Sequence, residues 1–186
     1  MSRSIRLAAV ALFVVVCWAV FEFSGLRERF SLRMLHDAFA AHVVTGLLLY
    51  IALFTLGNLI QIPGWLFLAA AVLALGRFWG GIATYVAACV CCIFTFFVIR
   101  AIGGDALRGI GGRVGQRLLT RLDAHPVQSV LLLRMLMQTA PALNYVLALS
   151  GIDFGSYLLG TLLGLPAPIA VYCIFFDGIA RWLHWT

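Results

Sequence analysis

The chain has 186 residues, of which 63% are hydrophobic and 11% are charged, and its mean hydropathy is +1.05. Because a soluble domain carries roughly 25% charged residues, this composition excludes a soluble globular protein and predicts an integral membrane protein. The formal net charge is +6, and all 13 basic residues are arginines, set against seven acids. These arginines lie between apolar runs, so we expect them to meet anionic lipid headgroups rather than nucleic acid.

Residues 1–37 are expected to form a first span followed by an interfacial helix. Two arginines precede the apolar part of 1–23, but no small residues mark a cleavage site after it. We therefore interpret this run as an uncleaved span rather than a signal peptide. In 24–37, apolar residues recur at every fourth position, which is typical of a helix lying at the membrane surface. A solvated loop fits this second piece equally well.

A first half of the membrane domain is predicted over residues 38–99. The run 38–60 is long enough to span, and Pro63-Gly64 interrupts the chain directly after it. The next apolar piece ends at Gly76, and its roughly 13 helical residues reach only about 20 Å, short of a hydrocarbon core of about 30 Å. We therefore expect a re-entrant helix over 62–76, with a kinked continuation of the preceding helix as the alternative. A clear span ends this half.

Five cysteines all lie in apolar runs, so a disulfide framework is not expected. The adjacent pair Cys91 and Cys92, with Cys89 nearby, could bind a soft metal ion. However, neighbouring helical residues diverge by about 100°, and small apolar thiols pack well in helices. We predict packing and no metal site.

Residues 100–126 form the most polar stretch of the chain. A stripe of apolar residues beside Arg113, Arg117 and Arg121 indicates a basic helix lying on the membrane surface, with a flexible loop as the alternative. With 38–60 counted as a crossing, this stretch and 24–37 share one side of the membrane and hold eight arginines. The opposite side then holds Arg3, Arg6, Arg77 and Arg181. The positive-inside rule places the eight-arginine side in the cytoplasm.

The second half, residues 127–186, contains the most informative residue of the chain. Arg134 lies inside an apolar run, and Pro141 interrupts that run seven residues later. A membrane-embedded charge beside a broken helix is costly and marks a functional-site hypothesis. We expect a second re-entrant piece over 127–149, then a long span after Gly151. In that span, the spacing of Gly160 and Gly164 permits close helix contact, Pro166 should kink the helix, and Asp177 and Arg181 can pair.

The two interrupted regions repeat one order of features: a proline, a short apolar piece, a glycine, a phenylalanine and a long span. With one crossing between them, the two short pieces approach the midplane from opposite faces, as in many transporters built from inverted repeats. The predicted fold is therefore a single all-α integral membrane domain over 1–186. It has about four spanning helices, two opposed re-entrant helices in a pseudo-inverted repeat, and interfacial amphipathic helices.

The stretch VLLLRMLMQTAPALNYVLALSGIDFGSYLLGTLLGLPAPIAVY resembles the second half of the VTT domain of the SNARE-associated Golgi protein, or DedA-like, superfamily. IPGWLFLAAAVLALGRFWGG resembles its first re-entrant piece, and the resemblance covers roughly residues 40–175. It implies opposed re-entrant helices and a role in lipid scrambling, lipid-carrier flipping or membrane homeostasis. The implied location is the cell membrane, as a multi-pass protein, which in a bacterium is the inner membrane.

The sequence departs from the family pattern at three places. Met137 stands where members usually have a proline, and Trp65 stands where the proton-coupled members have an acid. We also expect no counterpart of the usual final spanning helix after Asp177. We therefore do not expect proton coupling.

The expected substrate-binding residues are Arg134, Asn144, Tyr145, Pro141, Pro63 and Gly64, and the expected helix-packing residues are Gly151, Gly160, Gly164 and Pro166. Arg134 could hold a phosphate headgroup through bidentate hydrogen bonds, or it could clamp carbonyl groups of the opposing helix. A lipid or lipid-carrier transporter of the scramblase type is the favoured function. A non-transporting membrane-structural or partner-binding protein is the alternative, and a thiophilic-ion or small-solute permease is a minor one. No nucleophile–base pair, HExxH motif or P-loop is present, so we expect no enzyme, no catalytic residue and no cofactor.

Overall fold

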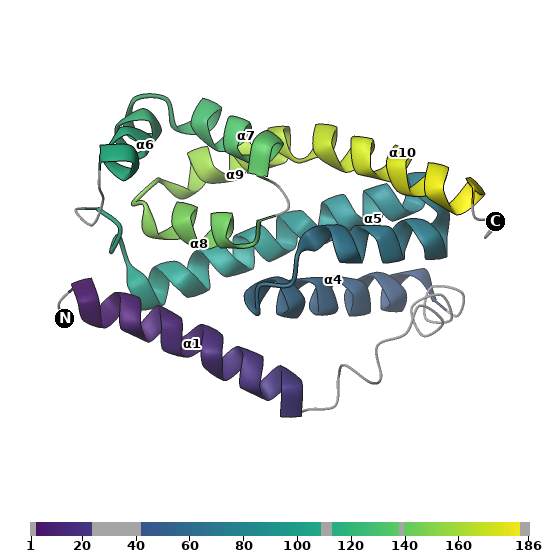
Figure 1. Ribbon diagram of the computed structural model, residues 1–186, viewed down its shortest axis with the longest axis horizontal. Helices are drawn as coiled ribbons and strands as arrows, with labels where there is room; N and C mark the ends of the chain where they lie inside the picture. Colours follow the sequence, from purple (N-terminus) through teal and green to yellow (C-terminus); the bar gives the residue numbers. More distant parts are fainter. Residues whose placement is uncertain (1–2, 24–41, 109–112, 138–139, 183–186) are drawn as a thin grey trace.

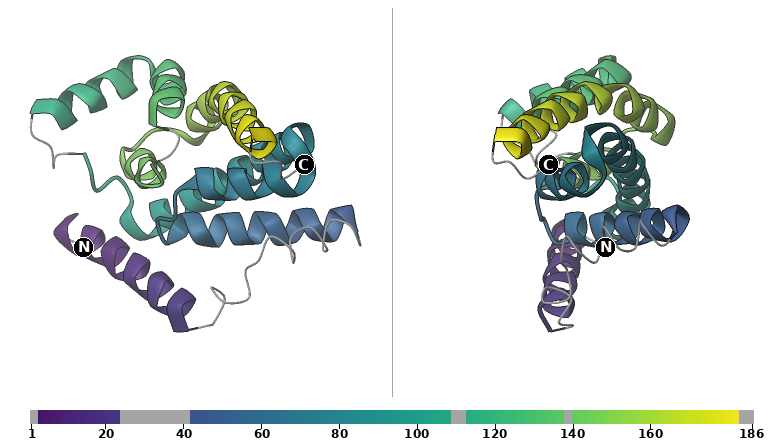
Figure 2. Two further views of the ribbon diagram at one scale, coloured as in Figure 1. Left: turned by 45° about the vertical axis from the view of Figure 1, so that its right-hand side comes forward. Right: turned by 90° about the vertical axis from the view of Figure 1, so that its right-hand side faces the viewer.

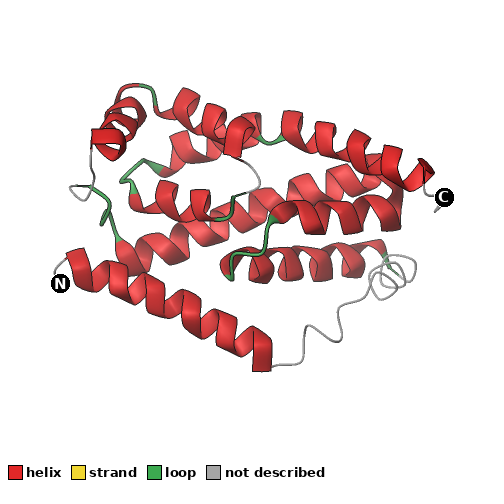
Figure 3. Ribbon diagram, in the orientation of Figure 1, coloured by secondary structure: helices red, strands yellow, loops and turns green. Residues whose placement is uncertain are grey.

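The computed structural model describes residues 3–23, 42–108, 113–137 and 140–182, and every regular element in these ranges is an α-helix (Figures 1 and 3). The helices are α1 (Arg3–Phe23), α4 (Val43–Leu59), α5 (Gly64–Gly103), α6 (Arg113–Ala124), α7 (Pro126–Met137), α8 (Ala142–Leu149), α9 (Phe154–Gly164) and α10 (Pro166–Trp182). The expectation of an all-helical fold is confirmed for these residues. The interfacial helix expected within 24–37 lies outside the described ranges.

Helix α5 is folded back on itself at Gly76. This residue has φ 77° and ψ 168°, a combination that only glycine adopts readily. A Cβ atom at Gly80 would lie 2.6 Å from the carbonyl oxygen of Ala71, so the segments before and after the turn are in backbone contact. We call residues 64–75 the short arm of α5 and residues 77–103 its long arm.

Helix α4 and the short arm of α5 form a first hairpin, whose tip is residues 60–63. The rings of Phe54 and Phe67 lie 5.3 Å apart across it, and the Tyr50 hydroxyl donates to the carbonyl oxygen of Phe67 over 3.1 Å. Pro63 caps the short arm with an extended backbone, and Gln61 has a positive φ of 67°. These two residues reverse the chain inside the bundle.

The second hairpin consists of α7 and α8, and Ala140 and Pro141 lie at its tip, directly before α8. Helix α7 packs closely on α9, because a Cβ atom at Gly160 would lie 2.8 Å from the carbonyl oxygen of Val127. The chain then continues into α10. Leu165 caps the end of α9, and α10 begins at Pro166.

The two hairpins enter the bundle from opposite ends and their tips meet near its middle, while the long arm of α5 and the α9–α10 pair run along its length (Figures 1 and 2). Two described stretches, Gly64–Gly103 and Phe154–Trp182, are long and apolar enough to cross a membrane. The predicted number of spans and the re-entrance of the hairpins are not established by these lengths and stay predictions.

The arrangement of the chain ends differs from the expected one. Val43 and Leu47 share a groove with Leu75 and Trp79, so α4 begins at the same end of the bundle as the Gly76 turn and does not cross alone. Arg6 of α1 forms an ion pair with Asp105 at 3.6 Å. The prediction that Arg6 and the 100–126 stretch lie on opposite sides is therefore wrong, because it counted 38–60 as an independent crossing.

Candidate functional site

Arg134 is the only charged residue among the buried side chains described, with 4% of its surface exposed. Its Nη1 donates to Asn144 Oδ1 over 2.6 Å, its Nη2 to the Tyr157 hydroxyl over 3.0 Å, and its Nε to Thr161 Oγ1 over 3.3 Å. The guanidinium carbon also lies 5.4 Å from the centre of the Tyr157 ring. Arg134 is thus held by three neutral side chains, from α8 and α9.

The hydrogen bonds continue from Arg134 to both tips. Asn144 donates through Nδ2 to Asn58 Oδ1 over 2.7 Å, so the amide accepts from the arginine and donates to the first hairpin. The Tyr145 hydroxyl donates to the carbonyl oxygen of Leu59 over 2.7 Å. Two neighbouring residues of α8 therefore bind the end of α4, and they join the tips of the two hairpins.

Tyr157 connects Arg134 to the long arm of α5. Its hydroxyl accepts from the arginine and donates to the carbonyl oxygen of Cys92 over 3.0 Å. Its ring packs against Phe96 at a centroid distance of 4.6 Å. The tyrosine is fully buried, so water does not reach either of its two hydrogen bonds.

No described carboxylate pairs with Arg134; the ion pairs recorded in the described part of the chain involve Arg6, Arg77, Arg108 and Arg181. Burying an ionised group costs several kcal/mol even after relaxation. Neutral acceptors offset part of this cost, since hydrogen bonds to a charged group are stronger than those between neutral groups. The arrangement leaves a positive charge in the middle of the bundle.

A small cavity of about 30 Å³ adjoins the guanidinium. Both hairpins and the long arm of α5 contribute to its wall, which includes Asn58, Gly64, Cys91, Cys92 and Asn144. A cavity of this size has room for about one water molecule and offers it polar partners. The site in this conformation is closed to anything as large as a phosphate group.

The structure brings several of the predicted binding residues together. Arg134, Asn144 and Gly64 border one cavity, Tyr145 joins the tips, and Pro63 and Pro141 stand at the starts of the short arm and of α8. Their role in substrate binding stays a prediction. The proposed carbonyl clamp differs from what is seen, because Arg134 donates to side chains.

Sequence reasoning missed Asn58, Tyr157 and Thr161. A signal for two of them was present, since Tyr157 and Thr161 are four residues apart and flank Gly160 in α9. This spacing puts polar groups on the same helix face as the contact glycines. Gly164 continues that face, and a Cβ atom there would lie 2.8 Å from Arg134 Cβ.

A family model of the VTT domain matches residues 62–178, which begin at the tip of the first hairpin and include Arg134 and its three partners Asn144, Tyr157 and Thr161. The chain belongs to the VTT domain family. Comparisons with curated proteins and with solved structures find no match. With its apolar helices, this VTT protein is a membrane protein of the DedA type.

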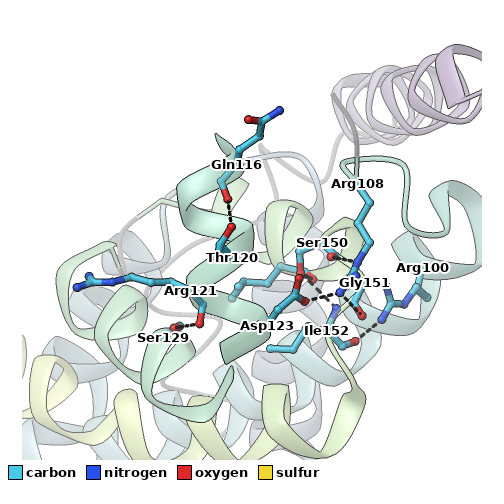
Figure 4. Close-up of polar contacts among 11 residues, drawn as sticks. Arg100, Arg108, Gln116, Thr120, Arg121, Asp123, Ser129, Ser150, Gly151 and Ile152 are labelled. Atoms are coloured by element: carbon cyan, nitrogen blue, oxygen red, sulfur yellow. Dashed lines mark hydrogen bonds and ion pairs between the residues drawn. The ribbon is translucent and has the colours of Figure 1, made fainter. Parts of the chain in front are cut away.

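A second polar cluster holds the base of the VTT domain's second hairpin (Figure 4). Arg108 donates through Nε to the carbonyl oxygen of Ser150 over 2.9 Å and through Nη2 to Asp123 Oδ1 over 2.6 Å. Arg100 donates to the carbonyl oxygen of Ile152. These arginines satisfy the carbonyl groups of Ser150, which caps α8, and of Ile152, which lies in the turn after it. Gly151, with φ 81°, makes the turn here, so it is a turn residue rather than the helix-packing residue we expected.

Four of the five thiols of the VTT protein are buried, and Cys17 is half-buried. Cys92 Sγ lies 3.4 Å from Asn144 Oδ1 and Cys91 Sγ lies 3.8 Å from Thr95 Oγ1. Within the described ranges, no group of three or more His, Cys, Asp or Glu side chains could hold a metal ion. The positive charge of Arg134 beside both cysteines further disfavours a cation there.

Proposed function

We propose that this VTT protein is a multi-pass protein of the cell membrane that moves lipids or lipid carriers between leaflets, in the manner of a scramblase and without proton coupling. The observation that carries the proposal is Arg134, a buried guanidinium with no described carboxylate partner, at the place where two opposed hairpins meet. An intramembrane charge at such a position is a substrate-site hypothesis.

In the proposed arrangement, α1, the long arm of α5 and the α9–α10 pair cross the membrane, and each hairpin re-enters from its own side. Non-helical backbone at membrane depth is tolerated where protein covers it. The tips meet this condition, since Asn58, Leu59 and Pro141 are buried. The end that carries Arg6, Arg100, Arg108, Arg117 and Arg121 is placed in the cytoplasm by the positive-inside rule.

The substrate chemistry we propose is a lipid phosphate. Arginine presents a planar fork of N–H groups that matches phosphate oxygens, and no described residue accepts from two of the five N–H groups of Arg134. For a headgroup to enter, the bonds Asn144–Asn58 and Tyr145–Leu59 at the tips must open. The phosphate then replaces Asn144 as the acceptor of Arg134.

One observation favours the alternative, a membrane-structural protein that moves no substrate. The cavity beside Arg134 measures only about 30 Å³, and three neutral side chains already bind the guanidinium. In that reading, Arg134 fastens α7 to α8 and α9, and the hairpins never separate. The two functions predict different effects on lipid flipping when a disulfide joins the two tips.

The experiment is reconstitution into liposomes that contain a fluorescent phospholipid, and in a second set a fluorescent isoprenoid phosphate. Flipping is followed by extraction of the outer-leaflet probe with albumin, which leaves a disulfide intact. The variant is Arg134→Ala, and the matched control is Arg117→Ala, an exposed arginine on α6. A second variant, Asn58→Cys with Asn144→Cys, allows the tips to be joined by a disulfide and released by reduction.

If the protein transports lipid, the native protein and Arg117→Ala accelerate flipping, whereas a folded Arg134→Ala does not. The disulfide between the tips should stop flipping, and its reduction should restore it. A well-folded native sample that moves neither probe refutes the transport proposal and supports the membrane-structural role. Should Arg134→Ala fail to fold, the joined-tip variant still decides between the two.

A further inference from the structure

Two arginines share one carboxylate at the end of the bundle opposite α6. Arg181 Nη2 lies 2.7 Å and Arg77 Nη1 lies 3.7 Å from the same oxygen, Asp177 Oδ2. The arginine side chains are 64% and 60% exposed, whereas that of Asp177 is 18% exposed. Two guanidinium groups against one carboxylate leave a net charge of +1 that faces outward.

A groove beside Arg77 runs between the long arm of α5 and α10. Its volume is about 490 Å³, and its wall includes Phe78, Ile82, Tyr85, Ile169 and Ile174. The two helices touch along the groove, because a Cβ atom at Gly81 would lie 3.0 Å from Cys173 Sγ. The surface is therefore apolar and closed at its base.

The dimensions of the groove fit one leaflet. It extends from Arg77 to Tyr85 on one helix and from Pro166 to Ile174 on the other, and eight residues of α-helix rise about 12 Å. Half of a hydrocarbon core of about 30 Å is about 15 Å. An acyl chain of a single leaflet thus matches its length.

Exposed aromatic side chains mark the same end of the bundle. Phe78, Trp79 and Trp182 are 68%, 65% and 81% exposed, and tryptophan concentrates where membrane and water meet. Arg77 adjoins Phe78 in the chain, and Arg181 adjoins Trp182. The two guanidinium groups therefore lie at the level of the lipid headgroups.

We propose that Arg77, Arg181 and the α5–α10 groove form a binding site for one anionic phospholipid of the leaflet at this end. The phosphate lies between the two guanidinium groups, where it competes with Asp177, and an acyl chain lies in the groove. Charge complementarity and the one-leaflet length select this occupant. The site is separate from Arg134, so the inference does not depend on whether the protein moves lipids.

The test is native mass spectrometry of the purified full chain released from detergent, titrated with phosphatidylglycerol, with phosphatidylcholine, or with inorganic phosphate. The main variant is Arg77→Gln with Arg181→Gln, and the matched control is Arg117→Gln with Arg121→Gln, two exposed arginines on α6. Ala170→Trp fills the groove without changing charge, since Ala170 is exposed and lines it. Asp177→Asn removes the competing carboxylate.

We expect one high-affinity phosphatidylglycerol per chain, with weaker binding of phosphatidylcholine and of inorganic phosphate. Each arginine near a membrane surface raises the affinity for anionic lipid about fivefold. The Arg77/Arg181 variant should therefore bind phosphatidylglycerol about 20-fold to 30-fold more weakly, and the α6 control should bind it as the native protein does. Ala170→Trp should weaken binding as well, and Asp177→Asn should strengthen it.

Equal binding of the two phospholipids overturns the proposal. An α6 control that loses as much affinity for phosphatidylglycerol as the main variant overturns it too. Inorganic phosphate that competes as well as the lipid, or unchanged lipid binding in Ala170→Trp, shows a surface anion contact and no lipid groove. A failure here leaves the flipping assay and Arg134 untouched.

Discussion

Gly164 of α9 sets how closely α7, and with it Arg134, approaches the rest of the bundle. A methyl group at Gly164 would lie 2.8 Å from Arg134 Cβ and 3.0 Å from the carbonyl oxygen of Leu131. Carbon atoms in contact are normally about 3.5–4.0 Å apart, so Gly164→Ala must push α7 away by about 1 Å. Overpacking of this kind costs about 1–3 kcal/mol.

The matched control is Gly178→Ala in α10, where nothing lies within 4 Å of the added methyl group. Because alanine is the better helix former, this change should be neutral or stabilise by up to about 1 kcal/mol. For a chain of this size, 1 kcal/mol shifts the melting temperature by roughly 2–4 °C. Both changes gain the same helix propensity, so we expect Gly164→Ala to melt roughly 2–12 °C below Gly178→Ala in the same detergent.

The measurement is the melting temperature of each purified variant by intrinsic tryptophan fluorescence. A second readout is the reactivity of Cys92, which should rise in Gly164→Ala because displacement of α7 loosens the wall of its cavity. Equal melting temperatures for the two glycine variants would refute the close contact between α7 and α9, and with it the rigid placement of Arg134.

Three further predictions concern single side chains. Tyr157→Phe leaves an arginine N–H and the Cys92 carbonyl without their buried partner, so it should lower stability by about 1–3 kcal/mol; an unchanged melting temperature contradicts the network. Gly76→Ala should cost about 1–3 kcal/mol through its backbone angles alone, although the added methyl group has open space; a variant as stable as Gly178→Ala argues against the turn. Asp153 accepts from the Ser156 backbone N–H, which lowers the pKa of its carboxyl group. Its stabilising effect is thus complete above the unfolded pKa of about 3.9 and is lost as pH falls through the lower folded pKa. Asp153→Ala should cost about 1 kcal/mol at pH 7, and this difference from the native protein should shrink below about pH 3.5; a constant difference contradicts the cap.

The sequence was sufficient to single out Arg134 and Asn144, because a charge and an amide stand out in apolar runs on either side of a proline. It was not sufficient to choose their partners. Which side chains reach the guanidinium depends on the rotation of α9 about its axis and on its distance from α7, and tertiary packing sets both. Tyr157 and Thr161 became visible as partners only once the contact of Gly160 and Gly164 with α7 was known.

The end at which α4 begins could not be predicted for a different reason. Hydropathy measures whether a run such as 38–60 is long enough to span, but it does not report where the chain reverses. Pro63 and the positive φ of Gln61 turn the chain within the bundle, so α4 becomes one arm of a hairpin. That single change moves Arg6 to the end that carries Asp105.

The charge of Arg134, which pairs with no carboxylate in the described ranges, also bears on ion leakage. The tips of the two hairpins meet around polar groups and a water-sized cavity. Without a fixed positive charge, such a place would offer cations a route through a membrane. A cation about 5 Å from the guanidinium meets a repulsion of about 3 kcal/mol at an effective dielectric constant of about 20, which lowers its local concentration on the order of a hundredfold. A fixed arginine is one of the devices by which pores exclude protons. Besides the phosphate binding that we propose for it, Arg134 would then keep the membrane potential from discharging through the centre of the protein.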